Sequence, residues 1–189
     1  MTSSDVNPLV TYGLFLAWAV HDAEELARGP RWLREYLPEL RERFPGVPEA
    51  VWEAVGRIDE REFAAAVGVM AVIVGAAAVA GARSGGRSAF YQGAVTGFGL
   101  HGLVHLAQAA AVRDVTPGAA TSPLVVIPFS LWARGRLRRA GVLRPVGPGG
   151  AVTGLAVAAG ATVVAHAVGS RVAASIGGAR AGRCGPSRF

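Results

Sequence analysis

An uninterrupted apolar stretch, residues 63–82, constrains this chain more than any other feature. It contains no charged side chain, and a helix of about 20 such residues crosses the hydrocarbon core of a bilayer. The stretch also lacks a polar face that could be turned to water. It therefore predicts a membrane-spanning helix and disfavours the alternative, a soluble helical bundle rich in alanine.

Four further apolar segments extend this prediction: residues 8–20, 90–112, 121–133 and 151–172. The second and fourth of them reach spanning length, whereas the first and third are short and require buried or interfacial polar flanks. Only 17% of the residues are charged, below the usual share of a soluble domain, about 25%. We expect an all-α, polytopic transmembrane helix bundle with about five membrane segments, forming one domain over residues 1–172.

One long polar segment, residues 22–62, interrupts the apolar pattern. It holds eleven acidic residues and seven arginines. Two short amphipathic helices are predicted, because apolar residues recur at helical spacing around Trp32 and again after Pro48. Pro48 is expected to be the first helical residue of the second helix. Their Trp and Tyr side chains favour the membrane interface. Residues 173–189 are rich in Gly, Ser and Arg and are predicted to be a disordered tail.

Arginine placement predicts the topology. The loops after residues 82 and 133 contain arginines and no acidic residue. Because cytoplasmic loops are enriched in basic residues, we expect a multi-pass protein of the cell membrane with a cytoplasmic N-terminus, although the basic tail would then lie outside. The arginines are dispersed over loops, so nucleic acid is not an expected partner. The expected partner is the lipid bilayer, and the sequence also allows a homo-oligomer.

A histidine and two glutamates follow the first apolar segment, in the run His21-Asp22-Ala23-Glu24-Glu25. On a continuing helix, the His21, Glu24 and Glu25 side chains share one face. In the predicted topology, all the histidines of the chain fall in the outer half of the bundle. They are His21, His101, His105 and His166.

This grouping predicts a shared metal site. The candidate ligands are His21, Glu24, Glu25, His101, His105 and His166. A divalent metal held by imidazoles and a carboxylate is expected to be zinc, with iron as the alternative. A carboxylate left over, Glu24 or Glu25, could serve as catalytic base. The alternative interpretation is that each histidine is an ordinary hydrogen-bonded interior residue and that the glutamates lie on a solvated turn of the helix.

The motif His21-Asp22-Ala23-Glu24-Glu25 also carries a family resemblance. The chain resembles the HXXEE-domain family, membrane proteins of unknown function, over about residues 10–135. The resemblance implies that the family has a further histidine, which His105 matches in this chain, and a Tyr-x-Pro-Gly motif. Here Val115 stands where that motif has tyrosine, whereas Pro117 and Gly118 remain and suit a tight structural turn.

Two functional hypotheses follow. The first is a metal-dependent membrane hydrolase that acts on a lipidic or membrane-presented substrate; with iron in place of zinc, the same site would predict an iron oxidoreductase. The alternative is non-enzymatic: a small transporter, or an ion or proton relay that uses the same histidines and glutamates. A phosphate-binding loop ending in lysine is excluded, since the chain has no lysine. Convergence of His21, the glutamates and His105 on one point would favour the metal site.

Overall fold

The structure is a computed structural model that describes residues 6–145, 160, 163–165 and 167–171. Its helices are α1 (Pro8–Arg43), α2 (Glu49–Gly56), α3 (Glu60–Arg83), α4 (Ala89–Val112), the π-helix η1 (Ser122–Val126) and α5 (Ile127–Arg139). Within this part of the chain there is no strand, so the all-α prediction is confirmed. Most of the predicted segment 151–172 and the tail 173–189 lie outside the described residues.

Of the helices described, only α3 and α4 are long and apolar enough to cross a membrane. They coincide with the predicted segments 63–82 and 90–112 to within three residues at each end. Side-chain caps fix both starts: the Asp59 carboxylate accepts from the backbone N–H groups of Arg61 and Glu62, and the Ser88 hydroxyl accepts from that of Tyr91. Such caps satisfy N–H groups that have no partner within the helix.

The helix α1 is much longer than the apolar segment that predicts it. It runs from Pro8 to Arg43, about 54 Å at 1.5 Å per residue. The first expected amphipathic helix is therefore a continuation of α1, in spite of Pro30 and Pro38 inside it. Each proline removes one backbone hydrogen bond but already has a helical φ angle. The second expected helix is α2, with Pro48 as its N-cap residue and not its first helical residue.

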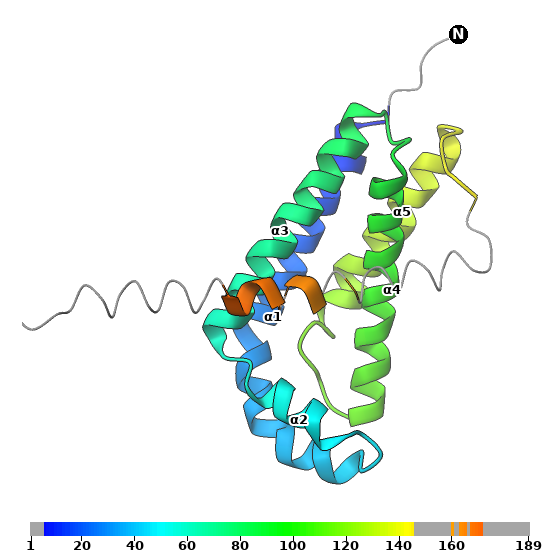
Figure 1. Ribbon diagram of the computed structural model, residues 1–189. Coiled ribbons are helices and arrows are strands. Elements are labelled where there is room, and N and C mark those ends of the chain that lie inside the picture. Colours follow the sequence, from blue (N-terminus) through cyan, green and yellow to red (C-terminus); the bar gives the residue numbers. More distant parts are fainter. Residues whose placement is uncertain (1–5, 146–159, 161–162, 166, 172–189) are drawn as a thin grey trace, which may run out of the picture.

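The helices pack as an elongated bundle in which α1 lies along α3, α3 along α4, and α4 along α5 (Figure 1). The start of α1, the α3–α4 turn and the end of α5 lie at one end, and α2 lies towards the other. A cluster of buried side chains, here called the apolar core, joins these helices. It comprises Val10, Leu14, Ala17, Trp18, Val74, Ala77, Tyr91, Val95, Phe98, Val126, Ala133 and Leu137.

Close contact between α3 and α4 characterises the apolar core. A Cβ atom at Gly81 would lie only 2.5 Å from Tyr91 Cγ, so the ring fills the space that glycine leaves. The Tyr91 hydroxyl donates a hydrogen bond to the Val10 carbonyl oxygen of α1. The Gln92 side chain is also satisfied, since its amide nitrogen donates to the Gly86 and Val142 carbonyl oxygens. This part of the bundle is tightly packed and its polar groups are paired.

Candidate metal centre

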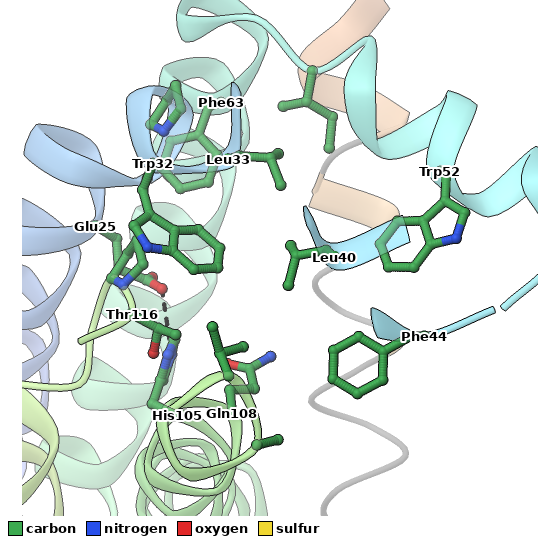
Figure 2. A pocket seen from close by; sticks show the side chains of 16 residues that line it. Glu25, Trp32, Leu33, Leu40, Phe44, Trp52, Phe63, His105, Gln108 and Thr116 are labelled. Carbon is green, nitrogen blue, oxygen red and sulfur yellow. Dashed lines mark ion pairs between the residues drawn. The ribbon is translucent and has the colours of Figure 1, made fainter. Parts of the chain in front are cut away.

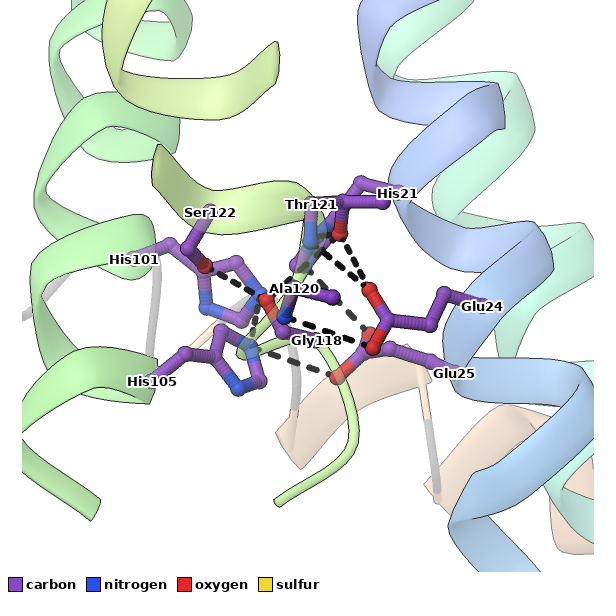
Figure 3. A network of polar contacts seen from close by, with 9 residues as sticks. All are labelled: His21, Glu24, Glu25, His101, His105, Gly118, Ala120, Thr121 and Ser122. Atoms are coloured by element: carbon purple, nitrogen blue, oxygen red, sulfur yellow. Dashed lines mark hydrogen bonds and ion pairs between the residues drawn. The ribbon is translucent and has the colours of Figure 1, made fainter. Parts of the chain in front are cut away.

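One helical turn of α1 faces one turn of α4 across the loop that leads into η1. His21 and Glu25 are four residues apart on α1, and His101 and His105 are four residues apart on α4. Because residues with this spacing share one helix face, each pair points towards the other helix, as Figure 3 shows. The sequence motif at the end of the first apolar segment thus lies inside the bundle.

The four side chains converge on one point. One ligand atom of each of His21, Glu25, His101 and His105 lies within 4.8 Å of the others. The Nε2 atoms of His101 and His105 are 2.9 Å apart. Glu25 approaches His105 Nε2 with Oε1 at 3.3 Å and His21 Nε2 with Oε2 at 3.8 Å. We call these four residues the His/Glu cluster.

The donor set suits a divalent metal such as zinc, which binds imidazole nitrogen and carboxylate oxygen at about 2.0–2.2 Å. His21 is fully buried and His105 is 7% exposed. Among the described residues, His21 Nε2 is buried without a hydrogen-bond partner, although buried polar atoms are normally paired. An ion in the cluster would supply that partner.

Glu24 does not join the His/Glu cluster. Its carboxylate turns to the loop before η1 and accepts hydrogen bonds from the backbone N–H and the hydroxyl of Thr121, at 2.9 and 2.7 Å. The Ala120 N–H group and the Arg28 guanidinium lie 3.4 Å from its other oxygen. Glu24 therefore anchors this loop to α1, beside the cluster.

The contact between Thr121 and Glu24 also fixes the tautomer of His21. Because the Thr121 hydroxyl donates its only proton to the Glu24 carboxylate, its oxygen is left to accept from His21 Nδ1, 2.8 Å away. The proton of the neutral imidazole then sits on Nδ1, and the lone pair of Nε2 faces the cluster. Such partners behind a ligand orient the imidazole and set its basicity.

The two neighbouring glutamates differ in their ionisation. Burial opposes the charge on Glu24, but the hydrogen bonds from Thr121 and Ala120 and the charge of Arg28 outweigh it, so the pKa of Glu24 lies below its ordinary value. Burial, and after it the charge of Glu24, raises the pKa of Glu25 to about 7. Glu24 is thus a fixed anion, whereas Glu25 is able to exchange a proton near neutral pH.

Pro117 and Gly118 form a turn that closes over the two helices. Gly118 has φ +78°, a conformation that glycine adopts without steric cost. A Cβ atom there would lie 2.8 Å from His105 Nδ1 and 2.9 Å from His21 Cε1. Glycine is therefore required for two reasons, its backbone conformation and its contact with two histidines of the cluster.

The structure thus brings together four of the predicted ligands and turns Glu24 away. His166 lies outside the described residues. Sequence reasoning missed Thr121, which links Glu24 to His21. The sequence shows only a hydroxyl residue three positions after Gly118. A contact between this loop and α1 leaves no spacing pattern from which it could be predicted.

Comparison with known proteins agrees with the motif. A family model, for proteins of unknown function with an HXXEE motif, matches residues 12–133. No curated protein and no solved structure matches the chain. The matched range covers more than half of the sequence and includes every member of the His/Glu cluster. The chain therefore belongs to the HXXEE family, for which no function is known.

Proposed function

We propose that this protein is a multi-pass membrane hydrolase in which His21, His101 and His105 hold a divalent metal and Glu25 acts as the base. The observation that carries the proposal is the convergence of these side chains within 4.8 Å of one another. Three imidazoles with one position left for water form a common type of catalytic zinc site. Zinc is favoured over iron for that reason.

The surface of the bundle supports a membrane location. The most apolar window of α3 has only 22% of its residues buried within the protein, and apolar side chains in it are exposed, Val72 by 73%. On α1, exposed apolar side chains recur at helical spacing: Leu9, Tyr12, Leu16 and Val20. A continuous apolar surface of this kind indicates contact with lipid. The proposal therefore keeps residues 8–20 and the start of α5 as shorter membrane segments beside α3 and α4.

Charge placement supports a cytoplasmic N-terminus. The α3–α4 turn and the end of α5 lie at the end of the bundle where α1 begins (Figure 1). Both are basic, with Arg83, Arg87, Arg136, Arg138 and Arg139. By the positive-inside rule, this end faces the cytoplasm and α2 faces outwards.

The chain's own groups can be assigned steps in hydrolysis. A bound metal would polarise a substrate carbonyl and make water more acidic. Glu25 takes a proton from water while the water oxygen bonds to the carbonyl carbon. Glu25 then returns that proton to the leaving oxygen as the carbon–oxygen bond breaks. Glu24 and Thr121 hold His21 in the tautomer that offers Nε2 to the metal.

The transporter hypothesis finds less support. A relay would need a polar path from the His/Glu cluster towards the cytoplasmic end. Towards that end lies the apolar core, with Leu14 1% and Val95 0% exposed, and few polar side chains are buried there, among them Thr11, Gln92 and Ser130. A packed apolar layer favours a closed reaction site over a conduction path.

Metal analysis tests the first half of the proposal. Protein purified in lipid nanodiscs is expected to contain about one equivalent of zinc. His101→Ala and His105→Ala should each lose it, while Glu39→Gln, an exposed change on α1, should keep it. Folded wild-type protein without stoichiometric metal, even after incubation with zinc, would refute the metal site.

Catalysis is tested separately with Glu25→Gln. The variant is expected to keep its zinc and to hydrolyse a lipidic ester about 10²–10⁴-fold more slowly, the usual contribution of a general base. Equal hydrolysis by Glu25→Gln and the wild type would rule out the assigned role of Glu25. Metal lost together with activity would make Glu25 a ligand and not the base.

A further inference from the structure

A cavity of about 440 Å³ opens next to the His/Glu cluster. This volume falls within the range of small-molecule sites, about 300–1,000 Å³. Its lining reaches from Glu25 and His105 to side chains far from the cluster. Figure 2 shows Glu25, His105 and Thr116 on one side and Phe44 and Trp52 on the other. A molecule in the cavity would therefore meet the proposed catalytic groups at one end only.

Most of the wall is apolar. Its apolar side chains include Leu33, Leu40, Phe44, Trp52, Ile58 and Phe63. Leu33 and Leu40 lie on the second half of α1, Trp52 on α2 and Phe63 at the start of α3, and Phe44 and Ile58 lie in the connections after α1 and α2. The part of α1 that continues beyond the first apolar segment therefore forms one wall of the cavity, and α2 contributes to another. Such an apolar wall favours an apolar chain as occupant.

Two polar groups on the wall lack partners. Thr116 is 3% exposed, and its hydroxyl has no hydrogen-bond partner among the described residues. The indole N–H group of Trp32 is buried and likewise unpaired there. Both side chains line the cavity. Neither atom has surface open to the cavity, so an occupant with oxygen acceptors would satisfy these two groups after a small rotation of the side chains. A pure hydrocarbon would leave them unpaired at a cost.

Hydrogen bonds connect the two sides of the cavity, the second half of α1 and the end of α4. The Tyr36 hydroxyl of α1 donates a hydrogen bond to the Asp114 carboxylate after α4. The Arg43 guanidinium donates to the Val112 carbonyl oxygen at 2.9 Å, and the Trp32 and Tyr36 rings stack at 4.9 Å between centroids. The cavity is therefore braced by contacts between the second half of α1 and the end of α4, and a site held in shape in this way loses less entropy on binding.

We propose that this cavity binds the single acyl chain of a monoacyl ester, with the ester carbonyl placed at Glu25 and His105 and the oxygens near it hydrogen-bonded by Thr116 and Trp32. The proposal rests on the proposed function, because it names the substrate class for that same site. A monoacyl ester combines what the wall requires: one apolar chain, and oxygen acceptors close to the reacting carbon.

Binding of a non-hydrolysable analogue tests this directly. The probe is a radiolabelled decyl glycerol ether, and the signal is saturable binding to protein in nanodiscs, corrected with nanodiscs that lack protein. Ala111→Trp places a large ring on the cavity wall, whereas Ala110→Trp adds the same ring next to it on α4, outside the lining. Both alanines are exposed, so neither change disturbs the packing.

The expected result is that Ala111→Trp weakens binding about tenfold or more, as filling a well-shaped cavity does, and that Ala110→Trp binds like the wild type. Thr116→Val should weaken binding about fivefold, the loss of one hydrogen bond, with no effect on binding of decane. Equal binding by the two tryptophan variants, or decane bound as well as the ether by the wild type, would overturn the proposal.

His101→Ala separates this proposal from the metal site. It should lose zinc yet bind the ether like the wild type, since it leaves the apolar wall intact. Wild-type protein that holds zinc but does not bind the ether overturns the substrate class and leaves the metal site standing. Wild-type protein that binds the ether, without ever holding zinc, supports the cavity as a lipid site and refutes the catalytic proposal alone.

Discussion

The apolar core and the His/Glu cluster both take residues from α1 and α4, but they differ in how their polar groups are satisfied. In the apolar core, Tyr91 finds a partner within the chain, and so does Gln92, the next residue on α4. In the His/Glu cluster, His21 Nε2 finds none among the described residues, and two imidazoles approach each other through Nε2. Tyr91 and Gln92 are thus satisfied within the chain, whereas the His/Glu cluster has a donor set that a bound metal would satisfy.

The largest expected effect concerns stability with and without metal. Excess zinc should stabilise the wild type by about 2.7 kcal/mol at a free concentration one hundred times the dissociation constant. His105→Ala should lose this gain. Val95→Ala, in the apolar core, should be less stable under both conditions and keep it. Denaturant unfolding in nanodiscs, with zinc or with a chelator, measures all three; a zinc gain that persists in His105→Ala would contradict the comparison.

Adding one methyl group to each region should separate their roles. Gly81→Ala places Cβ against Tyr91 and is expected to destabilise the fold by about 1–3 kcal/mol without changing zinc stoichiometry. Gly118→Ala, which displaces His105, should weaken zinc binding as well. Gly141→Ala is the control, since that glycine has a similar φ of +69° but no atom within 4 Å of an added Cβ. Equal zinc affinity in the last two variants would contradict the turn's role.

The hydrogen bonds behind His21 should have an intermediate effect. Glu24→Gln weakens the anchor of Thr121 and is expected to reduce zinc affinity about 10–100-fold, as changes behind a metal ligand do. Glu39→Gln, an exposed glutamate of the same helix, should leave affinity unchanged. Competition with a zinc chelator gives both constants. If the two variants behave alike, Glu24 has no part in orienting His21.

A smaller effect concerns protonation in the metal-free protein. The pKa of Glu25 is raised from 4.5 to about 7, so the folded protein binds more protons than the unfolded chain between these values. Ionising Glu25 therefore costs folding free energy as pH rises through this window. Because burial also raises the pKa of Asp22, to about 8, the difference between the infrared spectra of the wild type and Glu25→Gln should show one protonated carboxyl band that disappears near pH 7. A band lost near pH 4 would contradict the burial argument.

The smallest effect is expected at the position where the family motif has tyrosine. Val115 is 52% exposed, so Val115→Tyr should change stability by no more than about 0.5 kcal/mol and leave zinc affinity unaltered. Thermal unfolding and chelator competition measure the two quantities. A gain in affinity would indicate that a phenol hydroxyl at this position reaches the His/Glu cluster.

Local patterns were sufficient for the long apolar helices. The segments 63–82 and 90–112 predicted α3 and α4 because an apolar stretch of this length has few alternatives to a helix. The boundary after Val20 was less predictable. A change from apolar to charged residues ends a membrane segment by composition, yet the backbone of α1 continues to Arg43, because helix propagation depends on packing of the next turns as well as on polarity.

The sequence by itself determined the helical class, the family and the residue types of the His/Glu cluster, because hydropathy, motif order and side-chain chemistry are local properties. Only the tertiary structure decided which glutamate enters the cluster. Glu24 and Glu25 are adjacent in sequence but differ by about 100° around the helix axis, so one faces Thr121 and the other faces His105. That choice depends on the rotation and depth of α1 against α4, which no spacing within a single helix records.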